Sequence, residues 1–554
     1  MHFVVGVNGT GKTHFLQALC EIFLALSDWR LPHFPCALVY ELGASETTVR
    51  TVVLDTPGNR SSSSLWLAEG FGFPSDTSTE AFTSAILSLR SGKDLALHGL
   101  RPLIAPGTWP SGSSTPNLAA LPKAVLAYTS GHLAPWHSLW QRAVTGERLD
   151  LSSQSPSHDT ETERPAGWTS QLEREHADEP QGRRATTTKS ARPVEWRPLL
   201  LSTLSLRAAL LSVSLPQALK DLEEVENEGR REQFLRDLRA DGETRGGLSG
   251  LLARASWAWP VAVTFQMNFR PERWTEVIAR QAAGWLARAT TVIAEPTPGT
   301  GRLLVFDLRG PHKAEAIPSE LRLDYEDSLR TGGEALLALL GGPENTPFDR
   351  FQTLINLLEG GVISDISMGV RKTEQDVPHI IRLDELSDGE QMILGRMALF
   401  HLLEGQNDVL LMLDEPETHF NDKWKREIVN IVDGAISDTT NEVLISTHSA
   451  IVLTDVFQDE IVLLEKEEGK VRRVELVSPT FGADPGDLMM RVFGAQASVG
   501  KLATEWLDSK LLEEEWPAGS MEELQRLLNQ LGPGFHRSEL RTILNKRKGN
   551  ADSR

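Results

Sequence analysis

The chain has few of the features that mark secreted or membrane-spanning proteins. Only two cysteines, Cys20 and Cys36, occur among 554 residues, too few for a disulfide framework and typical of a reducing cytoplasm. No apolar run is long enough to span a membrane. The first 15 residues also lack the basic and apolar regions of a signal peptide. We therefore expect a cytoplasmic protein that does not bind a membrane.

Positive charge is scarce as well. Lys and Arg number 56 against 76 Asp and Glu, which gives a formal net charge of −20. This balance disfavours a protein that coats nucleic acid with its whole surface, although a local basic patch is compatible with it. The basic residues of the C-terminal tail are candidates for such a patch: Arg537, Arg541, Lys546, Arg547 and Lys548. A solvated helix end followed by a frayed terminus explains these residues better.

Apolar residues are almost absent from one long segment. Residues 152–193 contain no Ile, Val, Phe, Tyr or Met. Such a segment cannot bury enough surface to offset the entropy lost on ordering, so we predict a flexible insertion. The whole chain is 40% hydrophobic and 24% charged, as in soluble globular proteins. Its length predicts two to four domain-sized units.

Apolar periodicity elsewhere predicts an alternation of strands and helices. The predicted strands are 37–42, 47–55, 124–128, 257–267, 290–294, 302–308 and 379–383, with 37–42 and 47–55 forming a hairpin. The predicted helices are 80–89, 199–215, 216–238, 271–289, 333–340, 348–358 and 422–436. Polar loops are predicted at 59–64 and 106–117.

The motif GVNGTGKT at Gly6–Thr13 matches the phosphate-binding P-loop, G-x-x-x-x-G-K-[ST]. It follows a short apolar strand and precedes an amphipathic helix over 14–27, the context that phosphate binding needs. Lys12 would supply charge to the β- and γ-phosphates, and the Thr13 hydroxyl would ligate Mg²⁺. The alternative, a glycine-rich turn with a surface lysine, is disfavoured by this context. The expected nucleotide ligands are Gly6, Asn8, Gly9, Thr10, Gly11, Lys12, Thr13 and His14.

A second motif, LSDGEQ at Leu386–Gln391, precedes an apolar helical stretch over 391–403. A serine followed three residues later by glutamate also forms a capping box at a helix start. Taken alone, the motif is explained better by an ordinary helix cap.

A third motif ends a buried strand. Residues 409–413 are five consecutive apolar residues, and Asp414 and Glu415 follow them directly. Carboxylates at the C-terminal end of a buried strand lie where open α/β sheets bind ligands. Asp414 would hold Mg²⁺ and Glu415 would orient the attacking water. The alternative is an acidic pair that caps the next helix.

A fourth motif is His448 in the run Ser446-Thr447-His448-Ser449, in which the buried strand 443–445 ends. A histidine there can donate to a γ-phosphate, although a lone histidine is more often structural. The spacing of 34 residues from Asp414 leaves room for one crossover helix and one strand, a single βαβ step. The ordered set of Lys12, Ser387, the Asp414–Glu415 pair and His448 is much more specific than each motif alone.

On these motifs the chain resembles ABC-class ATPases of the RecF/SMC/OLD type, over about residues 1–55 and 370–465. Leu386–Gln391 resembles the ABC signature, with Asp388 and Glu390 where transporters usually have Gly and Gln. The run DEPETH at Asp414–His419 resembles the DEPE-x-H run of AAA-like proteins from bacterial anti-phage systems and OLD-family nucleases. His448 matches the switch histidine. The resemblance implies ATP and Mg²⁺ as ligands.

The resemblance implies a homodimer in which two heads enclose ATP. Lys12, Thr13, Asp414, Glu415 and His448 would act on the nucleotide of one head. The start of the signature helix, with Ser387, Gly389 and Glu390, would close over it from the other head. ATP would favour the closed dimer and hydrolysis would open it.

Three departures from the pattern bear on the subgroup. The strands that usually precede the P-loop are missing, so either the base is seated differently or the start codon was assigned too late. No glutamine is a confident Q-loop residue, and Gln266 is a weak candidate. The distance from Lys12 to Ser387 disfavours a transporter, and the lack of a long coiled coil disfavours SMC proteins proper.

These departures favour the defence-associated and restriction-associated group, such as the ATPases of Septu- or PARIS-like systems. We expect a sensor or regulatory ATPase acting with a separate effector, a nuclease or a toxin. One alternative is a nucleotide-binding scaffold that holds the effector with little hydrolysis. Another is a RecF-like DNA-repair ATPase, so DNA binding is possible.

The predicted fold class is an α/β P-loop NTPase. It would be an ABC-ATPase head with a mostly parallel central sheet, an antiparallel subdomain and a helical insertion. The predicted regions are an N-terminal ATPase lobe at 1–135, the flexible insertion with a helical region at 136–255, a mixed region of the head at 256–375, a C-terminal ATPase lobe at 376–490, and C-terminal helices and tail at 491–554.

Overall fold

The computed structural model describes residues 1–43, 49–70, 79–91, 100–109, 118–145, 198–225, 257–268, 276–294, 301–310, 312, 329–372, 380–495, 500–511, 521–532, 537–538 and 540–545. Its contacts divide the chain into two compact units. Unit 1 comprises Met1–His2 and Thr13–Ser446, and unit 2 comprises Phe3–Lys12 and Thr447–Arg554. Each unit is described separately.

Parallel strands form the centre of unit 1. Their order is β14 (Glu442–Thr447), β13 (Val409–Asp414), β6 (Ala124–Thr129) and β7 (Leu199–Leu201), each parallel to the next. In this register Asp414 lies between Thr129 of β6 and Ser446 of β14. Helix α12 (Asp422–Ile436) connects β13 to β14, as the spacing of the motifs predicted. Three polar side chains therefore reach the same edge of the sheet.

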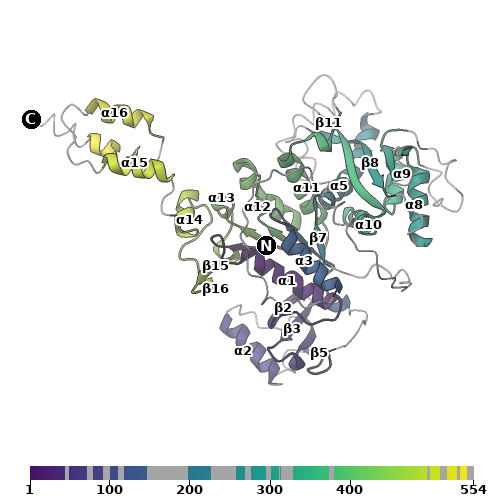
Figure 1. Ribbon diagram of the computed structural model, residues 1–554, viewed down its shortest axis with the longest axis horizontal. Helices are drawn as coiled ribbons and strands as arrows, with labels where there is room; N and C mark the ends of the chain where they lie inside the picture. Colours follow the sequence, from purple (N-terminus) through teal and green to yellow (C-terminus); the bar gives the residue numbers. More distant parts are fainter. Residues whose placement is uncertain are drawn as a thin grey trace, which may run out of the picture. The chain divides into compact units, whose positions relative to one another are not determined.

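An antiparallel sheet of β2 (Cys36–Leu42), β3 (Arg50–Thr56), β4 (Ser64–Glu69) and β5 (Arg101–Ile104) follows α1 (Lys12–Ser27). Its apolar side chains share a core with α1 and the parallel strands, and within that core the Cys20 thiol lies 3.9 Å from the Met412 sulfur. Helix α2 (Thr79–Arg90) packs on residues of β3 and β4 (Figure 1). Both cysteines are free thiols, as expected.

A second antiparallel sheet has the order β12 (Ile380–Arg382), β11 (Ile363–Lys372), β8 (Trp257–Met267), β10 (Arg302–Asp307) and β9 (Thr291–Ala294). Phe265, Trp285 and Phe306 pack edge to face in its core. The helices beside this sheet are α5 (Thr203–Val225), α8 (Glu276–Arg288), α9 (Gly332–Leu339) and α10 (Pro347–Glu359) (Figure 1). Helix α11 (Asp388–Leu402) follows β12 and packs on α5.

The remaining short elements of unit 1 lie in its connections. They are helix α3 (Ala134–Thr145) and the 3₁₀ turns η1 (Arg60–Ser62), η3 (Leu118–Ala120) and η9 (Leu383–Glu385). None of the helices in the described ranges is long and apolar enough to cross a membrane.

Unit 2 combines the N-terminal strand with the C-terminal part of the chain. Strand β1 (His2–Val5) pairs in parallel with β15 (Ile461–Glu467), and β15 pairs antiparallel with β16 (Lys470–Val474). The helical elements are α13 (Ala450–Leu453), η10 (Gln458–Glu460), α14 (Pro485–Arg491), α15 (Lys501–Leu511) and α16 (Met521–Gln530). The P-loop therefore leaves a strand supported by residues more than 450 positions later.

The coarse fold agrees with the sequence prediction: a mixed α/β protein with parallel strands at its centre and antiparallel sheets beside them. The prediction of a helix from residue 199 is wrong, because 199–201 pair with β6 as a strand. The break at Pro216 is also wrong, since α5 runs through it to Val225. A short apolar run does not distinguish a buried strand from a buried helix.

Some predictions lie outside the described residues. They are the flexible insertion at 152–193, the hairpin turn near 44–46, most of the loop at 106–117 and the helix beyond residue 225. The predicted polar loop at 59–64 ends one residue late, because Ser64 is already the first residue of β4. The structure also contains β4, β5, β11, β15 and β16, which the periodicity did not predict.

Candidate functional site

A buried carboxylate at the end of β13 collects three hydroxyl groups. Asp414 is 5% exposed. It accepts hydrogen bonds from Thr13 Oγ1 at 3.0 and 3.1 Å, from Thr129 Oγ1 at 3.1 Å and from Ser446 Oγ at 2.6 Å. Thr129 and Ser446 reach it because they occupy the register positions beside it on β6 and β14. These contacts offset the cost of burying the charge.

The third hydroxyl comes from the far end of the sequence. Thr13 is the last residue of the P-loop motif and lies in the first turn of α1, directly after Lys12 in the chain. It is 401 residues away from Asp414 in sequence. A threonine hydroxyl beside a carboxylate is the arrangement that holds Mg²⁺ in P-loop NTPases. The two residues that we predicted as magnesium ligands are therefore in direct contact.

Glu415 has an unusual backbone conformation. Its φ is 51°, in the left-handed region that a non-glycine residue adopts only at a cost. Its N–H donates to the Ser446 carbonyl at 3.1 Å and to the Ser446 hydroxyl at 3.2 Å. Its carbonyl accepts a hydrogen bond from the Ser130 hydroxyl at 2.7 Å. Both peptide groups of Glu415 are thus fixed by neighbouring strand ends, and this backbone positions its half-buried side chain.

The P-loop residues of unit 2 form a tight turn. A Cβ on Gly6 would lie 2.5 Å from the Leu464 carbonyl oxygen, so only glycine fits there. Gly11 has φ of 91°, again suited to glycine. The buried Lys12 ammonium donates to the carbonyls of Gly6 at 2.8 Å and Val7 at 3.4 Å. The P-loop backbone therefore surrounds the Lys12 ammonium with its own carbonyl groups.

The other predicted P-loop ligands differ in exposure. Thr10 is buried and its hydroxyl donates to the Val7 carbonyl at 2.8 Å, which closes the turn. Asn8, Gly9 and His14 are exposed. The exposed residues of the loop are accessible to a ligand, whereas Thr10 stabilises the loop conformation through its internal hydrogen bond.

Ser387 is the N-cap of α11. Its hydroxyl accepts from the Glu390 N–H, and the Glu390 carboxylate accepts from the Ser387 N–H at 3.0 Å and from its hydroxyl at 2.7 Å. This is the capping box that the sequence offered as the simpler explanation. Ser387 and Glu390 are also exposed, and Gly389 is half-buried. The cap leaves the helix start open to solvent.

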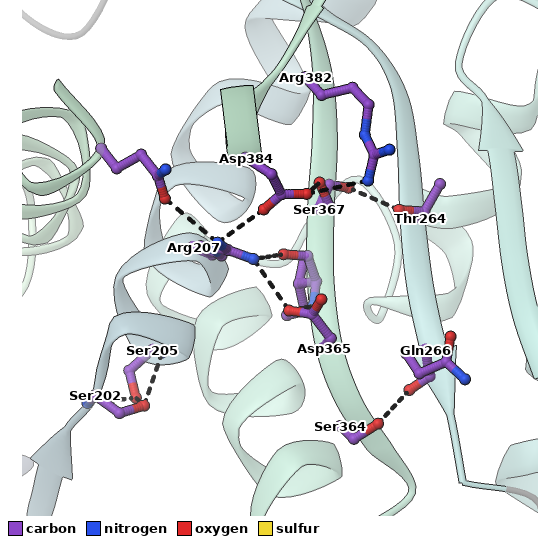
Figure 2. A network of polar contacts seen from close by, with 12 residues as sticks. Ser202, Ser205, Arg207, Thr264, Gln266, Ser364, Asp365, Ser367, Arg382 and Asp384 are labelled. Atoms are coloured by element: carbon purple, nitrogen blue, oxygen red, sulfur yellow. Dashed lines mark hydrogen bonds and ion pairs between the residues drawn. The ribbon is translucent and has the colours of Figure 1, made fainter. Parts of the chain in front are cut away.

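The segment before Ser387 is anchored by Arg207 of α5. Figure 2 shows its guanidinium directed toward Asp384 and Asp365. The ion pairs measure 2.8 Å to Asp384 and 3.1 Å to Asp365, and a hydrogen bond of 3.3 Å reaches Gln391 in the first turn of α11. Ser367 of β11 adds a 2.6 Å hydrogen bond to Asp384. The signature segment is thereby joined to the sheet that contains β11.

His448 and Gln266 lie in different parts of the fold. His448 follows β14 in unit 2 and is exposed, and the next residue, Ser449, donates its N–H to the Thr447 hydroxyl at 3.0 Å. Gln266 lies on β8 in the antiparallel sheet, where its carbonyl accepts from Ser364 at 3.3 Å (Figure 2). The role of His448 as the switch histidine and that of Gln266 as a Q-loop residue stay predictions. In the basic tail, Lys546, Arg547 and Lys548 lie outside the described residues.

Sequence reasoning missed Thr129, Ser130 and Ser446 as parts of this site. Each stands at the end of a predicted strand, which was the available signal. A serine or threonine at a strand end is too common to single out without the strand order. Only the pairing of β6 and β14 with β13 gives them a common carboxylate.

The donor set suits magnesium. Mg²⁺ takes oxygen ligands and is usually held by one or two carboxylates together with phosphates and waters. The Thr13 hydroxyl and the Asp414 carboxylate are such oxygens, in mutual contact. In the described part of the chain, no group of three or more His, Cys, Asp or Glu side chains could hold a metal without other ligands.

Known proteins resemble this chain only distantly. No protein-family model matches the chain, and no curated protein matches it. Among solved structures, the chain is similar to the Smc head domain with an extended coiled coil bound to the C-terminal domain of ScpA, from Pyrococcus furiosus. The identity is 9%, the TM-score is 0.23, and the match covers 86% of this chain and 90% of that chain. A similarity of this size carries no argument about the function of the chain.

Proposed function

We propose that this protein binds and hydrolyses ATP with Mg²⁺, as an ABC-class ATPase. The observation that carries the proposal is the hydrogen bond from Thr13, the last residue of the P-loop motif, to Asp414 at the end of β13. A strand-end carboxylate and a P-loop hydroxyl have this relation in P-loop NTPases. The contact joins two motifs that were identified independently in the sequence.

Each residue has a chemical role in this proposal. The amides of Gly9 and Gly11 and the Lys12 ammonium bind the phosphates. Thr13 and Asp414 would hold Mg²⁺, which when bound neutralises charge on the phosphoryl group. Glu415 orients the attacking water and accepts its proton, and His448 donates to the γ-phosphate.

We further propose that two copies enclose the nucleotide, with Ser387 and Gly389 supplied by the second copy. The exposed start of α11 supports this, because a helix N-terminus attracts anionic phosphate. In this reading the ATPase is a sensor or regulatory subunit that acts with a separate effector, a nuclease or toxin, in bacterial defence. The support for that role is the sequence resemblance of Asp414–His419 alone.

The decisive experiment compares the wild type with Glu415→Gln. We expect wild-type turnover that requires Mg²⁺, and a loss of about 10²-fold or more in the variant with ATP affinity retained, because the general base is gone. Glu404→Gln, at an exposed acid that pairs with His401, is the control and should keep turnover. Equal turnover in wild type and Glu415→Gln would remove Glu415 from the mechanism. ATP binding without turnover in the wild type would favour the scaffold alternative.

A further inference from the structure

A fully buried arginine lies in the middle of α11. Arg396 is 0% exposed. Its Nε donates to the Tyr128 hydroxyl at 2.9 Å, and its Nη1 donates to the carbonyls of Thr418, at 2.8 Å, and of Pro416. The guanidinium also lies 5.1 Å from the ring centroids of Tyr128 and Phe420. Its contacts thus come from β6 and from the turn after β13.

Burying a guanidinium is energetically unfavourable compared with burying an apolar side chain of similar size. Removing the charge from water costs several kcal/mol, and an apolar residue of similar volume often packs as well or better. What arginine adds is a rigid planar group whose several donors can hold more than one acceptor in a fixed geometry. Arg396 uses two nitrogens of this group: Nη1 donates to the carbonyls of Pro416 and Thr418, and Nε donates to the Tyr128 hydroxyl.

The turn that Arg396 holds begins directly after Glu415. Glu415 and His419, on either side of the held carbonyls, both have left-handed backbone conformations, with φ of 51° and 72°. Such conformations persist only where the surroundings over-determine them. Ser446 and Ser130 fix the turn at its start, through the peptide groups of Glu415. Arg396 fixes it at its end.

We propose that Arg396 is a positioning residue that holds Glu415 in its hydrolytic orientation and ties that orientation to the signature helix. Ser387 caps the same helix nine residues earlier, about 14 Å along it at about 1.5 Å per residue. A ligand that binds at the start of α11 therefore contacts the same helix that carries Arg396, and Arg396 is hydrogen-bonded to the turn after Glu415. The proposal rests on the proposed ATPase function.

The test uses Arg396→Lys, which keeps the charge but lacks the rigid planar group that holds the Tyr128 hydroxyl and the two carbonyls together. We expect kcat to fall at least about tenfold while the dissociation constant for ATP stays within about threefold, because misplacing a catalytic group affects the chemical step more than binding. Arg350→Lys is the matched control. Arg350 is similarly buried, at 3% exposed, but lies on α10 and donates to the Pro343 carbonyl, so its substitution should leave kcat unchanged.

A double-mutant cycle distinguishes positioning from general destabilisation. If Arg396 acts through Glu415, then Arg396→Lys should change nothing further in the Glu415→Gln background, and the two effects should be non-additive. The inference would be overturned if the two substitutions lowered kcat by the product of their separate factors, or if Arg396→Lys kept the wild-type kcat. If Arg396→Lys does not fold, Tyr128→Phe replaces it in the same cycle, with a smaller, several-fold loss of kcat expected. A wild type without ATPase activity would instead reject the proposed function itself.

Discussion

At the scale of residues, Asp414 shows how one carboxylate can organise a site. Its three hydroxyl partners come from the P-loop end, from β6 and from β14. Ser446 has a second task, because its hydroxyl and carbonyl also accept from the Glu415 N–H. The residue that supports the proposed magnesium ligand therefore also supports the proposed base.

This double role predicts the effect of Ser446→Ala. The substitution removes the 2.6 Å hydrogen bond to Asp414 and one acceptor of the Glu415 N–H. We expect a loss of about 1–3 kcal/mol in the free energy of unfolding, as for buried hydrogen bonds to charged groups, and a lower kcat. Urea unfolding and steady-state kinetics measure the two effects. Ser437→Ala, at an exposed serine after α12, should change neither.

Stability at alkaline pH depends on a partly buried tyrosine, Tyr40. Burial raises the pKa of Tyr40 above its ordinary value of 10.0, and its hydroxyl donates to the Ala120 carbonyl. Below pH 10 the phenol is protonated in both states. Above pH 10 the unfolded chain releases a proton that the folded chain keeps, so stability falls as pH rises toward the folded pKa. Tyr40→Phe should lower stability at neutral pH and reduce this alkaline slope, so that the difference between the two proteins shrinks as the pH rises above 10.

Urea unfolding at a series of pH values from about 8 to 11 measures that slope, with the range set by the ordinary tyrosine pKa. The loss at neutral pH should be about 1–2 kcal/mol, because the Ala120 carbonyl loses its donor. An alkaline slope identical in wild type and Tyr40→Phe would contradict the assignment.

At the scale of elements, α11 is held at two points. Arg207 of α5 fixes the segment that leads into it, and Arg396 fixes its middle to the turn after β13. The capping box at Ser387 completes its first turn. We expect a helix supported in this way to move as a rigid body rather than to bend locally.

Arg207→Ala tests the first of these points. Arg207 is 16% exposed and pairs with Asp384 at 2.8 Å, whereas Arg382, 65% exposed, pairs with the same carboxylate at 3.2 Å. We expect Arg207→Ala to cost about 1 kcal/mol of unfolding free energy and to speed hydrogen exchange over residues 380–391, since solvent screening weakens pairs of this exposure. The control, Arg382→Ala, should cost much less. Equal effects of the two variants would show that burial does not distinguish them.

The elements also show what sequence reasoning can reach. The run at 409–413 with its two following acids predicted β13 and the position of Asp414, because a buried parallel strand has a strong local signal. Residues 199–201 are equally apolar, but the periodicity predicted a helix there. The strand forms because these residues pair with β6, and a local pattern carries no information about such a distant partner. Thr129 and Ser446 could not be predicted as site residues, because only strand order gives them a shared partner.

At the scale of the whole molecule, the proposed mechanism requires a second copy. Glu415→Gln should retain ATP and accumulate as a dimer with Mg²⁺, because hydrolysis no longer reopens it. Light scattering with and without ATP measures the mass. Adding Ser387→Arg, a bulky substitution at the exposed start of α11, should keep the protein monomeric, whereas Ser437→Arg should not. A monomer in every condition would reject the enclosed-nucleotide arrangement while leaving ATP binding possible.

The two native thiols have a practical consequence for such experiments. Burial raises the pKa of Cys20, which lies in the core against Met412. Burial also raises the pKa of Cys36, although a hydrogen bond with Thr56 opposes the shift. At neutral pH both sulfurs are therefore poor nucleophiles. A cysteine introduced at an exposed position such as 404 or 437 would be alkylated first, so fluorescent or spin labels could be attached there in the otherwise native chain.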